Sequence, residues 1–253
     1  MRRSDRMTKA EIQFVRSLAD KRTRDQEQLF VAEGSKLVEE IIASGVAIHR
    51  IYTTRCDLKG ANVELINSSE MERISQLKTA TDTLAVVKQP RHILSIKALR
   101  SRLTIALDGV QNPGNMGTII RLADWFGVED IICTKECADL YNPKVVQATM
   151  GAILRMRVHY VDNLATLLRE AHTAGLNIYG TLLNGNNIYN TELNPSGIIV
   201  MGNEGRGISE ECRKELTHKL LIPPYPADAP TSESLNVAMA TGIILAEFRR
   251  REQ

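Results

Sequence analysis

The chain has 253 residues, of which 43% are hydrophobic and 25% are charged, and its formal net charge is only +2. Soluble domains usually hold roughly 100 to 200 residues, so this length predicts two domains. No apolar run approaches the ~20 residues of a membrane span, and polar sequence instead of a signal-peptide core follows Met1. We therefore expect a cytoplasmic protein without a membrane partner.

The cysteines exclude two further classes of protein. Cys56, Cys133, Cys137 and Cys212 show no paired CxxC spacing, which argues against both a zinc site and a disulfide framework. We expect free, mostly structural thiols, and the sequence predicts no metal site.

Charge is divided unevenly along the chain. The first 102 residues hold 19 Lys and Arg against 13 Asp and Glu, a balance of +6, whereas the remainder holds 13 against 17, a balance of −4. The excess is greatest near the N-terminus, between Arg2 and Arg24. A basic arm attracts a polyanion such as RNA, although a solvated tail explains the same charges.

The first part of the chain alternates helical and strand-like patterns. Helices are predicted over residues 11–19, 35–44 and 70–77, and strands over residues 30–34, 48–54 and 63–66. This alternation predicts a small α/β domain, which we bound at residues 1–95. Residues 88–102 contain Pro90, five Lys or Arg residues and little periodicity, as is typical of a linker.

The second part, residues 96–253, alternates buried strands with helices. Strands are predicted over residues 103–109, 131–134, 155–161, 176–181, 197–202 and 219–223, and helices over residues 116–126, 163–174, 210–216 and 235–250. This order implies a parallel sheet covered on both faces. Ligands of such sheets lie beyond the carboxyl ends of the strands, in the turns that lead into helices.

The first such turn reads NPGNMGTIIRLADWFG, residues 112–127. Its glycines let the backbone approach a ligand closely, and Asn115 is predicted to cap the following helix. Arg121 projects from a different sector of that helix than the apolar stripe, near a helix N-terminus that favours phosphate. A surface salt bridge with Asp124 or Asp108 is the alternative role for an isolated arginine.

Two more turns carry polar or glycine-rich motifs. VMGNEGRGIS, residues 200–209, has three glycines in six residues and can wrap an adenosyl group, although a plain strand-to-helix turn explains it equally well. SESLNVAMA, residues 232–240, opens the last helix, with Ser232 or Ser234 as the predicted cap and Asn236 in the first turn. Neither the dinucleotide-binding fingerprint nor the P-loop fingerprint is present.

Together, in content and order, these motifs resemble the three signature motifs of the SpoU/TrmH family of RNA ribose 2′-O-methyltransferases. The resemblance covers about residues 103–248 and implies a trefoil-knotted, parallel-sheet α/β domain of the SPOUT class, a topology that folding rules alone make improbable. It also implies S-adenosylmethionine as cofactor and a homodimer. An element in the first part, FVAEG with LVEE at residues 30–40, resembles the ribosomal-protein-like substrate-binding domain often joined to this catalytic half.

The resemblance assigns roles to individual residues. It places a group around the ribose and methyl group, with Arg121 assisting the 2′-hydroxyl: Arg121, Asn115, Glu204, Ser234 and Asn236. It places a second group against the cofactor, largely through backbone atoms: Thr181, Leu182, Met201, Gly202, Gly205, Ile222 and Leu235.

The chain departs from the family pattern at three places, one of which is Ala238, where the family has the last serine of the third motif. PKVVQATMGA, residues 143–152, resembles a family element, but Gln147 stands where a basic residue is common. The loop between residues 223 and 232 is longer and richer in proline than the compact family loop.

The resulting prediction is S-adenosylmethionine-dependent methylation of a ribose 2′-oxygen in RNA, with ribosomal RNA favoured over transfer RNA. The alternatives are a transfer RNA methyltransferase and a non-catalytic RNA-binding factor in ribosome assembly.

Overall fold

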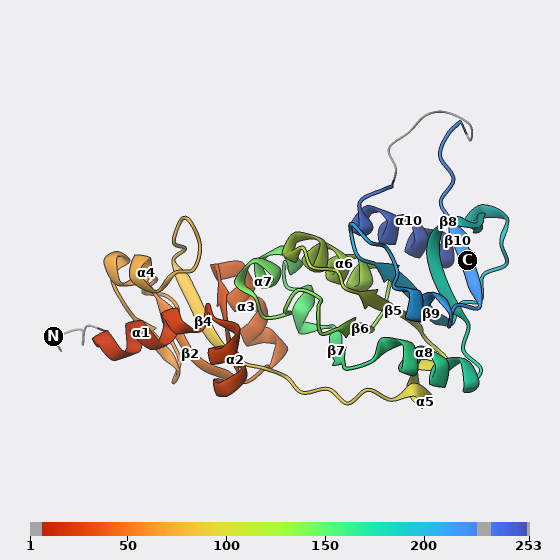
Figure 1. The fold of residues 1–253 in the computed structure, drawn as a ribbon. Helices are drawn as coiled ribbons and strands as arrows, with labels where there is room; N and C mark the ends of the chain where they lie inside the picture. The colour runs from red at the N-terminus through yellow and green to blue at the C-terminus, as the bar shows by residue number, and fades with distance from the viewer. Residues whose placement is uncertain (1–6, 227–233, 252–253) are drawn as a thin grey trace. The chain divides into compact units, whose positions relative to one another are not determined.

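The computed structural model describes residues 7–226 and 234–251, and its chain divides into two compact units. One unit comprises residues 1–91 together with residues 139–154, and the other comprises residues 92–138 together with residues 155–253. The chain therefore passes between the units three times (Figure 1). In the described residues, no helix is long and apolar enough to cross a membrane.

The first unit is built on a four-stranded mixed sheet in the order β1-β4-β2-β3. β4 is antiparallel to both β1 and β2, whereas β3 is parallel to β2. The strands are β1 (Leu29–Glu33), β2 (Ile48–Thr53), β3 (Val63–Leu65) and β4 (Thr83–Lys88).

Helices cover both faces of this sheet. On one face, α1 (Lys9–Ser17) and α4 (Ser68–Ile74) form an apolar core with Leu29 and Val31 of β1. On the other face, α3 (Ser35–Ser44) and α7 (Pro143–Thr149) pack against β1. α1 begins with a capping box between Thr8 and Glu11, which satisfies otherwise unpaired N–H groups.

Residues 139–154 fold onto the first unit although they lie between two strands of the second. Arg24 of α2 (Lys21–Glu27) is only 2% exposed and its Nη2 lies 2.6 Å from Oδ2 of Asp139. The ring of Tyr141 stacks on Phe30 of β1, with centroids 4.7 Å apart. Nε2 of Gln147 donates to the backbone oxygen of Glu33 over 2.8 Å. The segment thus contributes buried contacts to the unit and closes with a short 3-10 helix, η1 (Ala152–Leu154).

The second unit is a six-stranded, fully parallel sheet in the order β10-β8-β9-β5-β6-β7. Its strands are β5 (Leu103–Asp108), β6 (Asp130–Thr134), β7 (Arg157–Val161), β8 (Ile178–Asn187), β9 (Gly197–Gly202) and β10 (His218–Leu221). β5 and β9 lie at its centre and are almost wholly buried, as expected for strands covered on both faces.

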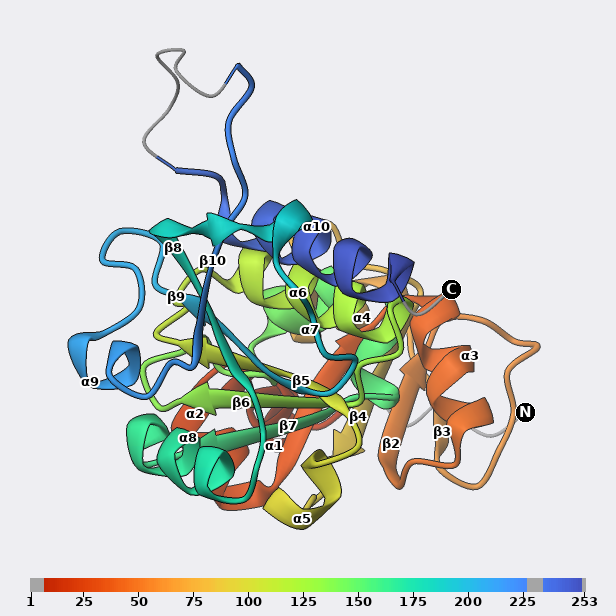
Figure 2. The same cartoon turned by 90° about the vertical axis from the view of Figure 1, so that its right-hand side faces the viewer.

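Two helix layers cover this sheet (Figure 2). α6 (Pro113–Trp125) and α10 (Val237–Arg250) pack side by side on one face. α5 (Ile96–Leu99), α8 (Leu164–Thr173) and α9 (Glu210–Arg213) share an apolar core on the other, which includes Leu168 and Cys212. A second short 3-10 helix, η2 (Ile188–Asn190), follows β8.

The α/β classes and the parallel sheet are confirmed, and three local predictions are corrected. Leu99 of α5 is 1% exposed, so the end of the expected linker belongs to the core of the second unit. Ser35, which suits a helix cap by residue type, instead begins α3, and the helix has no side-chain cap; α2 and β4 add elements to the first unit that were not predicted. All four cysteines are free, as expected. The trefoil knot stays an expectation from the family resemblance.

Candidate active site

The first motif forms a tight turn after β5 that leads into α6. Asn112, and not Asn115 as predicted, caps this helix: its Oδ1 accepts from the backbone N–H groups of Gly114 at 2.8 Å and Asn115 at 3.1 Å. Pro113 takes the first helical position, where its missing N–H has no cost. Asn115 lies within the first turn, so its side chain is left to make other contacts.

The second motif folds into a closed loop after β9. The backbones of Asn203 and Gly207 exchange two hydrogen bonds of 2.9 Å, and the Asn203 side chain donates to the backbone oxygen of Gly109 over 2.6 Å. Oδ1 of Asn203 also accepts from the N–H groups of Gly205 and Arg206. A polar side chain therefore holds the loop from within.

Close backbone packing requires glycine at the start of this loop. A Cβ on Gly202 would lie 2.2 Å from the carbonyl carbon of Gly207, which is impossible without moving the backbone. Gly205 differs, because a Cβ there would meet its nearest atom, Oδ1 of Asn203, at an ordinary 3.7 Å. Thus backbone packing requires glycine at position 202, whereas position 205 tolerates a small side chain.

Glu204 links the second motif to the first. Its Oε1 accepts from the backbone N–H of Asn112 at 3.2 Å and from Nδ2 of Asn115 at 3.0 Å, while Oε2 accepts from the N–H of Gln111 at 3.3 Å. Burial raises the pKa of this carboxyl group, but the donated hydrogen bonds outweigh burial and the net pKa lies below its usual value. Glu204 is therefore an anion at neutral pH.

The third motif joins the same cluster through Asn236. This residue, and not Ser234 as predicted, caps α10: its Oδ1 accepts from the N–H groups of Ala238 and Met239. Its Nδ2 donates to Oδ1 of Asn115 over 3.0 Å. The alternative cap, Ser232, lies outside the described residues.

A continuous polar chain thus connects the three motifs, running from Glu204 through Asn115 to Asn236. The structure brings these three predicted catalytic residues together. Ser234 lines the cavity beside them. Arg121 is exposed on α6, and it is not among the residues that line the cavity.

The cavity has a volume of about 630 Å³ and is lined by residues within β8, by the end of β9 with the loop after it, and by the end of β10 with the residues that lead into α10. Its lining includes every residue that the resemblance assigned to the cofactor: Thr181, Leu182, Met201, Gly202, Gly205, Ile222 and Leu235. Arg213 and Asn184 also line it, and no motif in the sequence singles them out; Val237, in the third motif, is a further lining residue.

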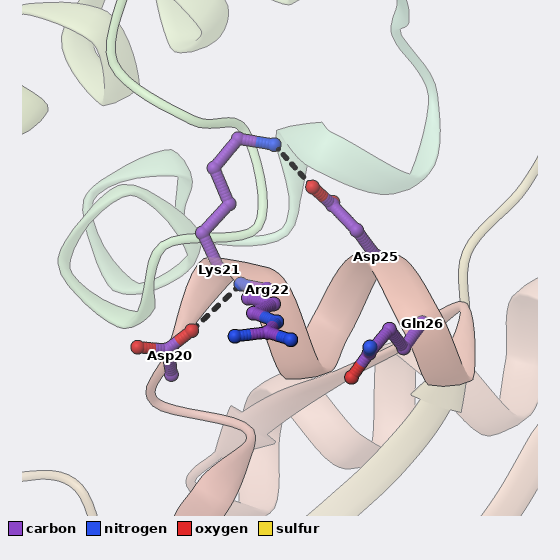
Figure 3. Close-up of a pocket in the computed structure, with 5 residues that line it drawn as sticks. All are labelled: Asp20, Lys21, Arg22, Asp25 and Gln26. Atoms are coloured by element: carbon purple, nitrogen blue, oxygen red, sulfur yellow. Dashed lines mark hydrogen bonds and ion pairs between the residues drawn. The ribbon is translucent and has the colours of Figure 1, made fainter.

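A second depression lies on the first unit, along α2 (Figure 3). Its lining comes from one seven-residue helix and its cap, where Lys21 and Asp25 pair at 2.7 Å. Both side chains of this pair are more than half exposed. The depression brings together no residues from distant segments of the chain, in contrast to the cavity of the second unit.

Comparison with known proteins identifies the protein family. The family model described as SpoU rRNA Methylase family matches residues 102–246, which is more than half of the chain. The chain belongs to this family. A second model, described as MRM3-like substrate binding domain, matches residues 9–95.

Similar proteins align over nearly the whole chain of this SpoU member. A TrmH-family structure from Porphyromonas gingivalis is 38% identical, with a TM-score of 0.87 and coverage of 97% of this chain and 99% of that one. The AdoMet-bound rRNA methyltransferase from Sinorhizobium meliloti is 28% identical, with a TM-score of 0.85 and coverage of 98% and 97%. The Bacillus subtilis 23S rRNA (guanosine(2553)-2′-O)-methyltransferase RlmP is 29% identical, and the alignment covers 92% of this chain and 94% of that protein.

Proposed function

We propose that this protein transfers a methyl group from S-adenosylmethionine to a ribose 2′-oxygen of ribosomal RNA. The observation that carries the proposal is the polar chain from Glu204 through Asn115 to Asn236, which stands beside a cavity large enough for a cofactor. The relatives named as ribosomal RNA 2′-O-methyltransferases favour this substrate class over transfer RNA. A cytoplasmic location belongs to the same proposal.

The lining of the cavity fits S-adenosylmethionine. Small-molecule sites commonly measure roughly 300 to 1,000 Å³ and combine apolar walls with a few polar groups. Here Leu182, Leu220 and Val237 provide apolar surface for an aromatic ring, and the loop around Gly202 brings backbone close to the cavity. When bound, this cofactor supplies an electrophilic methyl group on a positively charged sulfur.

The protein side chains must then position the ribose and assist loss of a proton from a weakly acidic alcohol. Arginine stays protonated in proteins, so Arg121 is a poor base. We assign Arg121 to holding the adjacent RNA phosphate and stabilising the negative charge that develops on the 2′-oxygen, while the phosphate or water takes the proton. Asn115, Asn236 and Glu204 hold the motif turns in place around the ribose, and Ser234 contributes a hydroxyl at the rim.

We further propose a homodimer formed through α6 and α10. Trp125 on α6 is 83% exposed and Met239 on α10 is 64% exposed, which is unusual for large apolar side chains on two neighbouring helices. Arg121 precedes Trp125 by one helical turn and is also exposed. By contrast, the apolar stripe of α10 through Ile244 and Phe248 is buried within the chain. Analytical ultracentrifugation of the wild type and of Trp125→Glu tests this interface. The wild type is expected to be a dimer and Trp125→Glu a monomer. A monomeric wild-type protein would overturn the proposed dimer.

The first 95 residues are proposed to bind the RNA substrate, which leaves residues 96–253 as the methyltransferase domain. The two family models, at residues 9–95 and 102–246, support this division by sequence, whereas residues 139–154 fold with the first unit and residues 92–95 with the second. Filter binding of ribosomal RNA at increasing salt tests the assignment. Charge-reversal variants of Arg2, Arg3 and Arg6 are expected to weaken binding and to lower its salt dependence.

The decisive experiment is methyl transfer from labelled S-adenosylmethionine to ribosomal and transfer RNA from a strain that lacks the protein. Label at one ribose of ribosomal RNA is expected, with a loss of roughly a hundredfold or more in Arg121→Ala. Arg121→Lys keeps the charge but not the fork of donors, so partial activity is expected. Tight RNA binding without any label would instead support the non-catalytic assembly factor.

A further inference from the structure

One charged residue that lines the cavity, Arg213, lies outside the three family motifs. Among the described lining residues, the only charged side chains are Glu204, Arg206 and Arg213. Glu204 is engaged by three donors from the first-motif segment. Arg213 lies at the end of α9.

The position of Arg213 is set by α9 and by the loop. Ser209 caps the helix through its side chain, which accepts from the N–H of Cys212, and its backbone oxygen accepts from the N–H of Arg213 at 2.9 Å. The guanidinium reaches back over Gly207: a Cβ on that glycine would lie 3.3 Å from Nη2 of Arg213. Gly207 has a positive φ of 69° and no side chain, so the arginine can occupy this space.

Within the described residues, this guanidinium makes no hydrogen bond or ion pair, although it borders the cavity. Arg157 and Arg169, also in the second unit, have carboxylate acceptors in Asp130 and Glu215. A planar fork of donors suits a carboxylate or another oxyanion. We therefore expect Arg213 to bind an anionic group of the molecule that occupies the cavity.

We propose that Arg213 binds the α-carboxylate of the methionine moiety of S-adenosylmethionine. This inference rests on the proposed function. The ligand has one carboxylate and two cationic groups, the ammonium and the sulfonium. The described lining of the cavity has one anion, Glu204, and two cations, Arg206 in the second-motif loop and Arg213, whose guanidinium reaches over Gly207. Coulomb energy favours the carboxylate near Arg213 and the sulfonium near Glu204. Arg213 is thus a positioning residue that directs the methyl group toward the polar chain.

Isothermal titration calorimetry of the full chain tests this assignment without any transfer reaction. The ligands are S-adenosylmethionine and its decarboxylated analogue, S-adenosyl-3-methylthiopropylamine. The wild type is expected to prefer the carboxylated ligand by about five- to tenfold, the strength of one exposed charge-assisted contact. Arg213→Gln is expected to lose this preference and to bind the analogue as the wild type does, and Arg213→Lys is expected to retain part of it.

Two controls make the result specific. Lys214→Gln removes the next cation on the chain, which does not line the cavity, and is expected to leave both affinities unchanged. Arg206→Gln removes the other lining cation. The inference is overturned if Arg213→Gln keeps the wild-type preference, if the preference depends on Arg206 instead, or if Arg213→Gln weakens only RNA binding. A wild-type protein that binds neither ligand would overturn the proposed function itself, and the inference with it.

Discussion

The side-chain amide of Asn236 donates to the side-chain oxygen of Asn115 over 3.0 Å, and this contact joins the first turns of α10 and α6. The same amide group caps α10 through its oxygen. One asparagine thus has two separable functions, because the cap uses Oδ1 and the contact with Asn115 uses Nδ2.

Two substitutions of Asn236 are expected to separate these functions. Asn236→Ala removes the cap and should lower the free energy of unfolding by about 1 kcal/mol. Asn236→Asp keeps an oxygen for the cap but loses the donor to Asn115, so stability should change less while methyl transfer falls. Urea denaturation and the labelled-methyl assay measure the two effects. Equal loss of stability in both variants would contradict the separation.

Gly202 and Gly205 of the second motif allow a matched comparison of two alanine substitutions. Gly202→Ala places a Cβ 2.2 Å from the backbone of Gly207, so the loop must open and S-adenosylmethionine binding should be lost. Gly205→Ala meets only Oδ1 of Asn203 at 3.7 Å and should keep the stability of the wild type within about 0.5 kcal/mol. Thermal unfolding and calorimetric titration test both variants. A folded Gly202→Ala protein with unchanged affinity would contradict the role of close packing.

A buried carboxylate is expected to make stability depend on pH. Asp130 is 5% exposed; burial raises its pKa, but hydrogen bonds from Arg157 and His159 outweigh burial and lower the pKa from 3.8 to about 2. A pKa that is lower in the folded state stabilises the fold above the unfolded pKa, and this stability is lost as pH falls through the folded pKa. At neutral pH, the ionised Asp130 therefore contributes about 2 kcal/mol to the free energy of unfolding.

Asp130→Asn is therefore expected to be less stable by about 2 kcal/mol at pH 7, and the difference should shrink as the pH falls from about 4 to about 2. Urea denaturation of both proteins across this range measures it. Asp162→Asn is a suitable control, because that carboxylate is 84% exposed and its ion-pair partner in the described part of the chain is Lys135. A difference that stays constant with pH would show that the effect is not ionic.

Several parts of the fold follow directly from the sequence pattern. The central strands β5 (LTIALD) and β9 (GIIVMG) are dominated by apolar residues, as expected for strands buried on both faces. α3 likewise covers the predicted residues 35–44, and Gly45, which follows them, adopts the positive φ of 73° that favours glycine at a helix end. These elements have local signals that agree with their final environment.

Other parts depend on contacts between distant residues, which local patterns do not reveal. Asn112 and Asn115 both suit a helix cap, and only the geometry of the turn selects Asn112 and leaves Asn115 to meet Asn236. The element around Gln147 reads as a loop that enters a helix, yet it packs on a strand more than 100 residues earlier. Gln147 uses its amide to donate to that strand, which gives a structural reason for a neutral residue where the family often has a basic one.

The segment of residues 139–154 leads to a last prediction about the first unit. Nη1 of Arg24 donates to the backbone oxygens of Leu18 and Ala19, while Nη2 pairs with Asp139. Asp139→Ala would leave a buried guanidinium with its carbonyl partners but without a counter-charge, which should cost about 3 kcal/mol of unfolding free energy.

A double-mutant cycle distinguishes this ion pair from simple loss of packing. Arg24→Met keeps the apolar stem of the side chain and removes the charge, so the double variant Arg24→Met, Asp139→Ala should lose less stability than the two single variants together. Urea denaturation supplies the four free energies. If the losses of unfolding free energy in the two single variants add up to the loss in the double variant, Arg24 and Asp139 do not interact in solution. If the double variant loses less, the ion pair between these residues, 115 positions apart in the chain, stabilises the packing of residues 139–154 on the first unit.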